Sequence, residues 1–507
     1  MTGLHRPIVF SFIDRYSVIV INLLMTMIVA RLMTPGEIGV FVIGAAVVVL
    51  MESLRDFGVS AYLIQVQEIT EGGVRTAFTA MLILSLIFAI GIYLLAGPVA
   101  RFYGDLRIVQ VLHITAFSFL FAPFVAPNVS LLRRDLSFGS VALINVSGAI
   151  ANFIGTLTLA VNGAGYLSLA WGALASSITV AIVANALRRQ FWIFRPSLQA
   201  WRKVAAFGGY SSASTLVNVT FQLLPQLVLG RILSLHAVGI YSRAVVICQL
   251  PDKAIVGALQ PLMLPALAAQ ARRGGDLQEI YLLWVGHLTV ILWPGLICLA
   301  LLADPIVAVL LGPQWSAAAP LVRIMAIGWL FLAPAALTYP MLVSIGRVRD
   351  TLTLSLVSLP ISATIVSACS FIGLQAVASS MLVTAPFQLW VALFYVRRYI
   401  RFAWIDIAIA TRKSALVTLC TAFSPATAVA FGGFRFDLSI TEMAVAITGA
   451  AAGWFVGLAL TAHPLLGVLR GFLGVLRGLI VRILVTAIYI PSERILGNTR
   501  ADRTSES

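Results

Sequence analysis

Charged residues are scarce in this sequence: they make up 10% of its 507 residues, against roughly a quarter in an average soluble domain. Hydrophobic residues make up 60%. A fold of this size cannot keep that much apolar surface from water, so most of it must face lipid. The net charge is +15, but the basic residues form short clusters between apolar segments. This spacing excludes the continuous basic groove of a nucleic-acid-binding protein.

Residues that carry metal or catalytic chemistry are also few. The four cysteines have no CxxC spacing, which argues against a zinc site or a disulfide framework. The five histidines are scattered, without carboxylates at HExxH spacing. None of the three lysines follows a glycine, so a GxxxxGK phosphate-binding loop is absent. The sequence therefore predicts no metal, no cofactor and no catalytic residue.

Long apolar segments dominate what remains. A helix needs about 20 apolar residues to cross the hydrocarbon core, and turn residues such as those at 162–165 and 373 divide the longest segments. The chain is thus predicted to be an all-α integral membrane protein of about 14 transmembrane helices. The predicted spans are 12–30, 38–62, 76–98, 108–132, 139–161, 166–187, 206–230, 238–265, 280–303, 317–345, 352–371, 375–396, 414–432 and 442–462.

The distribution of Arg and Lys predicts the orientation of these spans. Both tails and the even-numbered connections carry 24 basic residues, the odd-numbered connections carry five, and five lie within spans. Connections rich in Arg and Lys stay in the cytoplasm. We therefore expect an inner-membrane protein of a bacterium with its N- and C-termini in the cytoplasm.

The sequence carries signs of an internal duplication. Shifted by 200 residues, the segment 30–41 aligns with 230–241, so that the arginine, the glycine and the final aromatic residue coincide. Arginine pairs end both six-span sets, at 188–189 and 397–398. Six is an even number of spans, so both copies would start on the same side of the membrane and form parallel repeats.

This duplication predicts four regions. Helices 1–6 would form an N-terminal lobe (1–205) and helices 7–12 a C-terminal lobe (206–413), facing each other across a central cavity. Helices 13 and 14 (414–463) would be appended. Residues 464–507 would form a basic interfacial helix, on which Arg470 and Arg477 share one face, and a disordered tail. Such an architecture is typical of transporters.

Short motifs along the chain resemble a known family. They are IVARLMTPGEIGVF (28–41), DFGVS (56–60), LLGPQW (310–315) and APL (319–321). Their order and spacing resemble the Wzx-type polysaccharide flippases of the multidrug/oligosaccharidyl-lipid/polysaccharide exporter superfamily. The resemblance implies translocation of an undecaprenyl-diphosphate-linked oligosaccharide. It implies as partners that lipid-linked substrate, membrane lipids, a polysaccharide polymerase and a chain-length regulator.

Charged residues within spans are the candidate site residues, because an ion at a helix centre costs about 2.5–3.5 kcal/mol on insertion scales. In related flippases, arginines on helices 1, 2 and 8 bind the lipid diphosphate, and by this resemblance Arg15, Arg55 and Arg243 are expected to do so. Lys253 and Arg323 are further candidates, since basic side chains suit phosphate oxygens. Asp56 and Asp252 are candidates for ion coupling.

Alternatives remain open at this stage. The charged residues could instead pair within the bundle, as Arg15 with Asp14 or Asp56, and Lys253 with Asp252. The chain could be a multidrug extruder of the same superfamily, although the arginines within the spans of this chain do not suit cationic drugs. A membrane-embedded polysaccharide-processing enzyme would need a large outer loop with a catalytic constellation. A purely structural scaffold would leave the arginines within spans unexplained.

Overall fold

The computed structural model describes residues 5–467 apart from 57–58, 67–68, 274 and 434. Every regular element in this part of the chain is a helix, which confirms the all-α prediction. The elements before residue 200 are α1 (His5–Leu32), α2 (Pro35–Arg55), α3 (Val59–Gln65), α4 (Glu71–Tyr103), α5 (Arg107–Phe121), η1 (Ala122–Phe124), α6 (Ala126–Arg134), α7 (Phe138–Val161), α8 (Leu167–Leu187) and η2 (Phe191–Phe194). The later elements are α9 (Trp201–Ile232), α10 (Leu235–Cys248), α11 (Leu250–Arg272), α12 (Leu277–Leu301), α13 (Ala303–Leu310), η3 (Pro313–Ala318), α14 (Ala319–Ala335), α15 (Thr338–Ser344), α16 (Val348–Ser370), α17 (Leu374–Arg397), α18 (Trp404–Phe431) and α19 (Ile440–Leu460).

Twelve helices of the described residues are long and apolar enough to cross a membrane. They match twelve of the fourteen predicted spans. The other two, 206–230 and 238–265, coincide with α9 and with the consecutive helices α10 and α11, and the count of fourteen stays a prediction. The interfacial helix and tail predicted from residue 464 onward lie almost entirely outside the described residues.

Four predicted spans are interrupted helices rather than continuous ones: 38–62, 108–132, 238–265 and 317–345. Proline marks two of these interruptions. Pro123, Pro127 and Pro251 are the second residues of η1, α6 and α11. Proline lacks the N–H that an interior helix position donates, but the first turn does not need it. These prolines therefore begin new helical segments.

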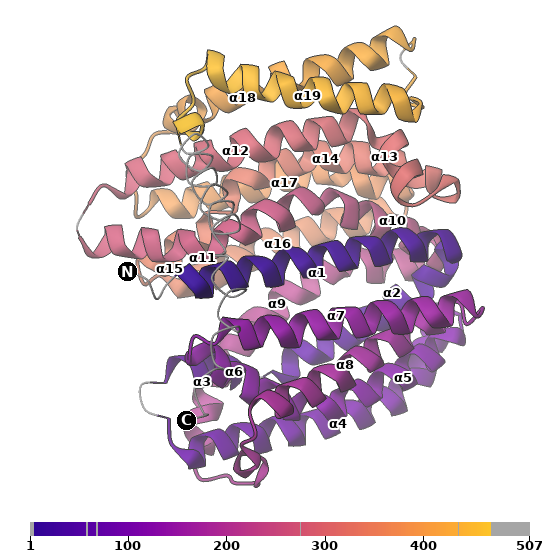
Figure 1. Ribbon diagram of the computed structural model, residues 1–507, viewed down its shortest axis with the longest axis vertical. Helices are drawn as coiled ribbons and strands as arrows, with labels where there is room; N and C mark the ends of the chain where they lie inside the picture. Colours follow the sequence, from indigo (N-terminus) through magenta and orange to yellow (C-terminus); the bar gives the residue numbers. More distant parts are fainter. Residues whose placement is uncertain (1–4, 57–58, 67–68, 274, 434, 468–507) are drawn as a thin grey trace, which may run out of the picture.

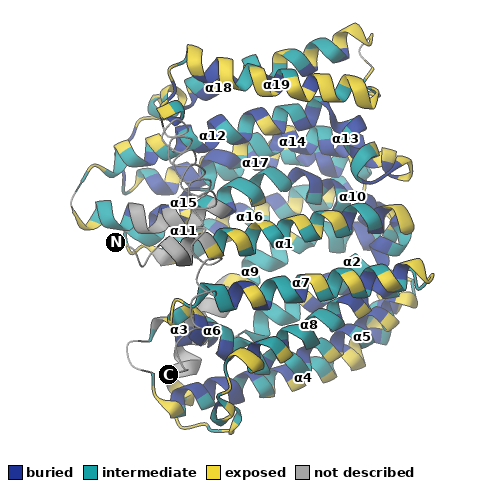
Figure 2. Ribbon diagram, viewed as in Figure 1, coloured by how far each residue is buried: buried dark blue, intermediate teal, exposed yellow. Residues whose placement is uncertain are grey.

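Figure 1 shows two groups of helices with α18 and α19 beyond the second group. The same five pairings occur in both groups: α1·α7, α2·α5, α4·α5, α5·α8 and α7·α8 in the first, and α9·α16, α10·α14, α12·α14, α14·α17 and α16·α17 in the second. The α18–α19 hairpin packs on α12. Buried residues lie where helices face each other, and exposed apolar residues cover the outward faces, as expected for contact with lipid (Figure 2).

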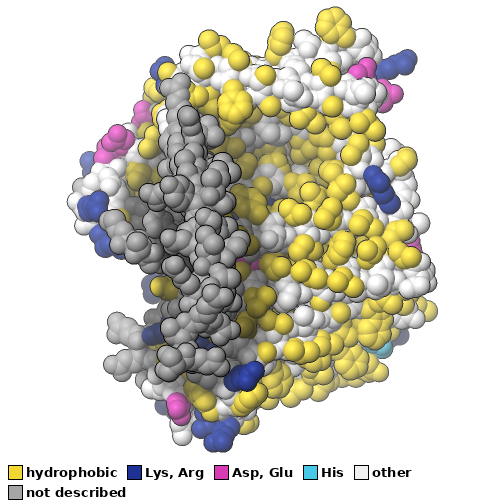
Figure 3. All heavy atoms as spheres, viewed as in Figure 1, with side chains coloured by type: hydrophobic (Ala, Val, Ile, Leu, Met, Phe, Trp, Pro, Cys, Tyr) yellow, Lys and Arg dark blue, Asp and Glu magenta, His cyan; other side chains and the backbone are white. Residues whose placement is uncertain are grey.

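Basic side chains gather at one end of the molecule. In Figure 3, Lys and Arg are frequent on the left, at the end where the N-terminus lies in Figure 1, and sparse on the right. The right-hand end carries the turn 162–165, where Gly163 (φ 80°) and Gly165 (φ 52°) adopt a backbone conformation that favours glycine.

At this right-hand end, α2 and α10 cross very closely. Thr34 and Ser234 cap the two helices by accepting hydrogen bonds from the N–H groups of Glu37 and Ala237. A Cβ on Gly39 would lie 1.7 Å from the Leu235 carbonyl oxygen, and a Cβ on Gly239 would lie 1.9 Å from the Pro35 carbonyl oxygen. Only glycine allows such an approach at both positions. The aligned motifs of the sequence therefore contact each other reciprocally.

The segment around η3 fastens the end of α1 at the same place. The fully buried Trp315 donates its indole N–H to the Ala30 carbonyl at 2.6 Å, and Gln314 donates to the Met33 carbonyl at 3.2 Å. Arg31 donates to the Val309 carbonyl at 2.8 Å. The last carbonyls of a helix have no hydrogen-bond donor within the helix. Gln314 and Trp315 supply donors to the carbonyls at the end of α1. The motifs 28–41 and 310–315 thus form one contact that joins the two groups of helices.

Candidate functional site between the two lobes

The α1–α8 group and the α9–α17 group are called the N-terminal and C-terminal lobes below. Arg243 lies near the middle of α10, four residues after Gly239. Residues four apart share a face of a helix, so Arg243 belongs to the α10 face that crosses α2 of the N-terminal lobe. Its Nε is buried without a hydrogen-bond partner, and no carboxylate of the described residues forms an ion pair with it. Arg243 is half-buried, and a guanidinium with a buried N–H and no counter-ion is costly, which makes this position a candidate anion site.

Arg55 ends α2 and is also poorly paired. Its side chain is 15% exposed, and Nη1 lies 3.8 Å from a carboxylate oxygen of Glu52, which is 42% exposed. The guanidinium carbon lies 5.1 Å from the centre of the Phe119 ring, and Nε is buried with no partner. One long ion pair leaves most of the five donors of the guanidinium for another acceptor.

Arg15 connects the two lobes. Its Nε donates to the Lys253 carbonyl of α11 at 3.3 Å, and the neighbouring Tyr16 hydroxyl donates to the Ala254 carbonyl at 3.1 Å. A Cβ on Gly257 would lie 1.3 Å from Nη2 of Arg15, so glycine makes room for the guanidinium. The Lys253 side chain is exposed. Neither Arg15 with Asp14 or Asp56 nor Lys253 with Asp252 is among the four ion pairs within the described residues.

Arg323 also has a buried Nε without a hydrogen-bond partner, but its charge is paired. It forms an ion pair with Asp304 of α13, and its guanidinium carbon lies 3.6 Å from the centre of the Phe436 ring. The side chains of Arg323 and Asp304 are 27% and 34% exposed. This arrangement is the pairing within the bundle that the sequence left open, and it links α14 with the connection between α18 and α19.

The acidic candidates lie at helix ends. Asp56 is the C-cap of α2 and accepts a hydrogen bond from the Ser60 hydroxyl at 2.7 Å. Asp252 lies in the first turn of α11 and is half-buried. A third carboxylate, not predicted as a site, is Asp14: Asn145 of α7 donates to one of its oxygens at 3.0 Å, and the other oxygen is buried without a partner.

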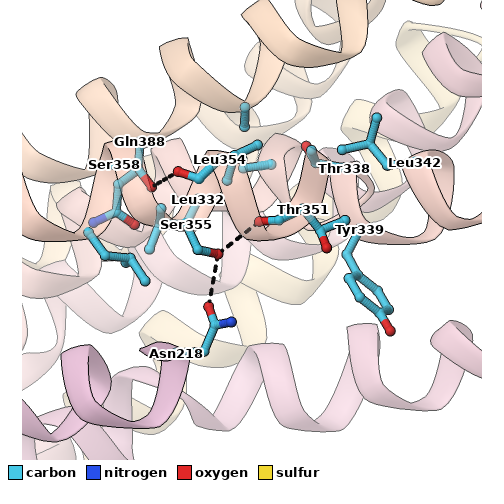
Figure 4. A pocket seen from close by; sticks show the side chains of 13 residues that line it. Asn218, Leu332, Thr338, Tyr339, Leu342, Thr351, Leu354, Ser355, Ser358 and Gln388 are labelled. Carbon is cyan, nitrogen blue, oxygen red and sulfur yellow. Dashed lines mark hydrogen bonds between the residues drawn. The ribbon is translucent and has the colours of Figure 1, made fainter. Parts of the chain in front are cut away.

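A second feature that the sequence did not predict is a pocket of about 400 Å3 in the C-terminal lobe (Figure 4). Its lining is mostly apolar but includes a group of hydroxyl and amide side chains, and it is called the polar pocket below. Helices α9, α14, α15, α16 and α17 contribute its walls. One signal of it was present in the sequence. Thr351, Ser355, Ser358 and Ser362 recur at intervals of four, three and four residues, which places four hydroxyl groups on one face of α16.

Several known proteins have similar sequences. The model of a family described as "Polysaccharide biosynthesis protein" matches residues 28–320. The succinoglycan biosynthesis transport protein ExoT of Rhizobium meliloti is 27% identical over 323 residues, which cover 63% of this chain and 65% of that protein. The lipopolysaccharide biosynthesis protein WzxC of Escherichia coli is 22% identical over 323 residues, 62% of this chain and 65% of that protein. The matching segment thus spans about two thirds of the length of these curated relatives.

Solved structures show a similar fold. The lipid II flippase MurJ in an inward closed conformation aligns with a TM-score of 0.71 at 14% identity, covering 90% of this chain and all of that one. An inward-facing multidrug resistance MATE transporter aligns with a TM-score of 0.59 at 16% identity, covering 79% of this chain and 99% of that one. At these identities the likeness concerns the fold alone. The family match covers more than half of the sequence and confirms the resemblance of its motifs: this multi-pass membrane protein belongs to the polysaccharide biosynthesis protein family.

Proposed function

We propose that this protein is a flippase that moves an undecaprenyl-diphosphate-linked oligosaccharide across the bacterial inner membrane for the synthesis of a surface polysaccharide or exopolysaccharide. The observation that carries the proposal is the half-buried Arg243 on the α10 face toward the other lobe, whose Nε is buried without a hydrogen-bond partner and which forms no ion pair within the described residues. A lipid diphosphate carries negative charge and several acceptor oxygens, which a guanidinium binds in pairs. The family membership and the printed names of the relatives support the same substrate class.

The ligand would contact basic residues from both lobes. Arg243 and Arg55 have unsatisfied buried Nε groups, and Arg15 and the exposed Lys253 lie at the contact of α1 with α11. We assign the diphosphate to these four residues. Arg323 contributes less, because Asp304 already balances its charge.

We further propose that the two lobes are parallel repeats. Gly39 contacts Leu235, and Pro35 contacts Gly239. Position 35 of one copy thus contacts the equivalent of position 39 in the other copy, and the reverse, as expected for two copies related by an approximate two-fold axis. The five matching helix pairings support the same relation. An axis between α2 and α10 along the membrane normal keeps both copies in one orientation.

This arrangement suits alternating access. The basic end with the N-terminus would face the cytoplasm by the positive-inside rule, so the crossing of α2 and α10 would close the outer side. The diphosphate would enter from the cytoplasmic side, and separation of the crossing would release it outward. Because no nucleotide-binding loop exists in the sequence, an ion gradient or the membrane potential would drive the cycle, with Asp56 and Asp252 as the proposed coupling residues.

Deletion of the gene tests the function. The mutant should lose one surface or secreted polysaccharide and accumulate its undecaprenyl-diphosphate-linked repeat unit, and wild-type protein should restore export while Arg243→Ala should not. Normal polysaccharide export together with raised drug sensitivity would reject the flippase and favour a multidrug extruder. Accumulation of unlinked or unmodified polymer would favour a polysaccharide-processing enzyme.

A further inference from the structure

The polar pocket of the C-terminal lobe has no role in binding a diphosphate. Its thirteen lining residues include no Arg, Lys, Asp, Glu or His. Without basic groups it does not suit phosphate, and without carboxylates it does not suit an organic cation. Its volume of about 400 Å3 falls within the usual range of small-ligand pockets, roughly 300–1,000 Å3.

The polar side chains converge from three directions. Ser355 and Ser358 of α16 are buried, Asn218 projects from α9 on one side, and Gln388 projects from α17 on the other (Figure 4). Ser355 donates to Oδ1 of Asn218 at 3.0 Å, and Gln388 donates to the Ser362 hydroxyl at 3.0 Å. These bonds hold the amides of two different helices against the hydroxyl face of α16.

The hydroxyl groups of this face are oriented by their own helix. The single proton of the Ser355 hydroxyl is shared between Oδ1 of Asn218 and the Thr351 carbonyl, each at 3.0 Å. Ser358 donates to the Leu354 carbonyl at 2.9 Å, and Ser362 to the Ser358 carbonyl at 2.8 Å. A hydroxyl that donates in this way still has lone pairs to accept a hydrogen bond. The pocket therefore presents ordered acceptors to a ligand that carries donors.

Apolar side chains complete the lining. Leu332, Leu342, Leu354 and Leu359 line the pocket beside the hydroxyl and amide groups, and the exposed Tyr339 lies at its edge. A sugar ring has the same mixture of hydroxyl groups that donate and accept and of C–H faces that need apolar contact. No other common neutral component of a lipid-linked oligosaccharide carries as many hydroxyl groups.

We propose that this pocket is the saccharide subsite and binds a neutral sugar residue of the lipid-linked substrate through its hydroxyl groups. The inference rests on the proposed function and assigns the diphosphate and the sugar of the substrate to different sites. Basic residues between the lobes hold the diphosphate of any such lipid, whereas Ser355, Ser358, Asn218 and Gln388 respond to the sugar. The pocket would thus determine which oligosaccharide is transported.

The test is a binding experiment with purified full-length protein in detergent. One probe is undecaprenyl diphosphate, and the other is the lipid-linked repeat unit isolated from the deletion strain. The wild type should bind the sugar-bearing lipid at least tenfold more tightly. Ser355→Ala and Gln388→Leu should each reduce that preference about fivefold, the effect of one lost hydrogen bond, and leave the affinity for undecaprenyl diphosphate unchanged.

Thr353→Ala is the matched control, because Thr353 lies on the exposed side of α16 and, among the described residues, its hydroxyl bonds only the Arg349 carbonyl. The Thr353→Ala variant should bind the sugar-bearing lipid in preference to undecaprenyl diphosphate as strongly as the wild type does. If Gln388→Leu does not fold, Ser358→Ala serves in its place, since it removes a single oxygen. Pocket variants that keep the sugar preference overturn the proposal. Failure of the wild type to bind either lipid, or failure of the deletion strain to accumulate one, rejects the flippase function itself.

Discussion

An added methyl group at the crossing of α2 and α10 should open the outer side of the protein. In Gly39→Ala the new Cβ would lie 1.7 Å from the Leu235 carbonyl oxygen, and in Gly239→Ala it would lie 1.9 Å from the Pro35 carbonyl oxygen. An ordinary contact needs at least 3.4 Å, so the helices must separate by roughly 1.5 Å or more. Such overpacking costs about 1–3 kcal/mol, and about 1.4 kcal/mol changes a two-state ratio tenfold.

The assay measures how often the crossing separates. Ile43 lies one turn further along α2 than Gly39 and is fully buried, so Ile43→Cys provides a reporter in a background without the four native cysteines. A membrane-impermeant maleimide added from outside should label this cysteine about tenfold faster in Gly39→Ala and Gly239→Ala than in the parent, because each substitution destabilises the closed arrangement.

Gly36→Ala is the control, since a Cβ on Gly36 has no atom within 4 Å, although it lies on the same helix. Its labelling rate should equal that of the parent. Equal labelling of all three alanine variants would show that the close approach of the helices does not keep the outer side closed, and the proposed gate would be wrong.

Two further substitutions concern stability. Arg323→Ala should lower the free energy of unfolding by about 1–3 kcal/mol, because it leaves the Asp304 carboxylate unpaired; thermal unfolding in detergent measures this. Burial and the nearby His287 and Lys413 lower the pKa of His463 to about 4. As pH falls from about 6.5 toward 4, the unfolded chain takes up a proton that the folded protein does not, so stability should fall over this interval, and His463→Gln should show a weaker pH dependence.

The Arg323 prediction has a comparison within the chain. Arg107 pairs with Asp105 at 2.7 Å, but its side chain is 47% exposed, and exposed pairs contribute only about 0–1 kcal/mol. Arg107→Ala should therefore cost less than Arg323→Ala. An equal loss in both variants, or an unfolding temperature of the wild type that does not fall between pH 6.5 and 4, would contradict the reasoning.

The spans were predictable because a segment that crosses lipid must be long and continuously apolar, and because the charged residues of the connections mark its ends. The turn at 162–165 and the one at Gly373 separate helices as predicted. The interruptions at 122–126 and 249 were not, because proline also occurs inside continuous helices such as α9 and α16, at Pro225 and Pro360. A proline alone does not distinguish a bend from a new segment.

The sequence motifs contain the residues that join the lobes, but the sequence did not predict that they contact each other. Residues 28–41 resembled a family, and their alignment with 230–241 suggested a repeat, but the reciprocal glycine contacts depend on packing. Trp315 bonds a carbonyl 285 residues away, a distance along the chain that no local pattern encodes. These residues join the lobes, and that structural demand explains why the motif is rich in glycine and capping residues.

The candidate site was predictable only in part. Charge within a span singled out Arg243 and Arg55, which the structure leaves without adequate partners. The same criterion selected Arg323, whose partner Asp304 lies 19 residues away across a connection. The polar pocket carried too weak a signal, because serine and threonine often bond their own helix. Asn218 and Gln388 join the hydroxyl face only through the packing of α9 and α17.

The central claim is that a cationic site between the lobes carries the diphosphate of a lipid-linked oligosaccharide, and a translocation assay in proteoliposomes tests it most directly. Wild-type protein should move the lipid-linked repeat unit from one leaflet to the other, and Arg243→Ala should slow this at least tenfold while Thr353→Ala leaves it unchanged. Equal translocation by wild type and Arg243→Ala, with both variants folded, would contradict the account.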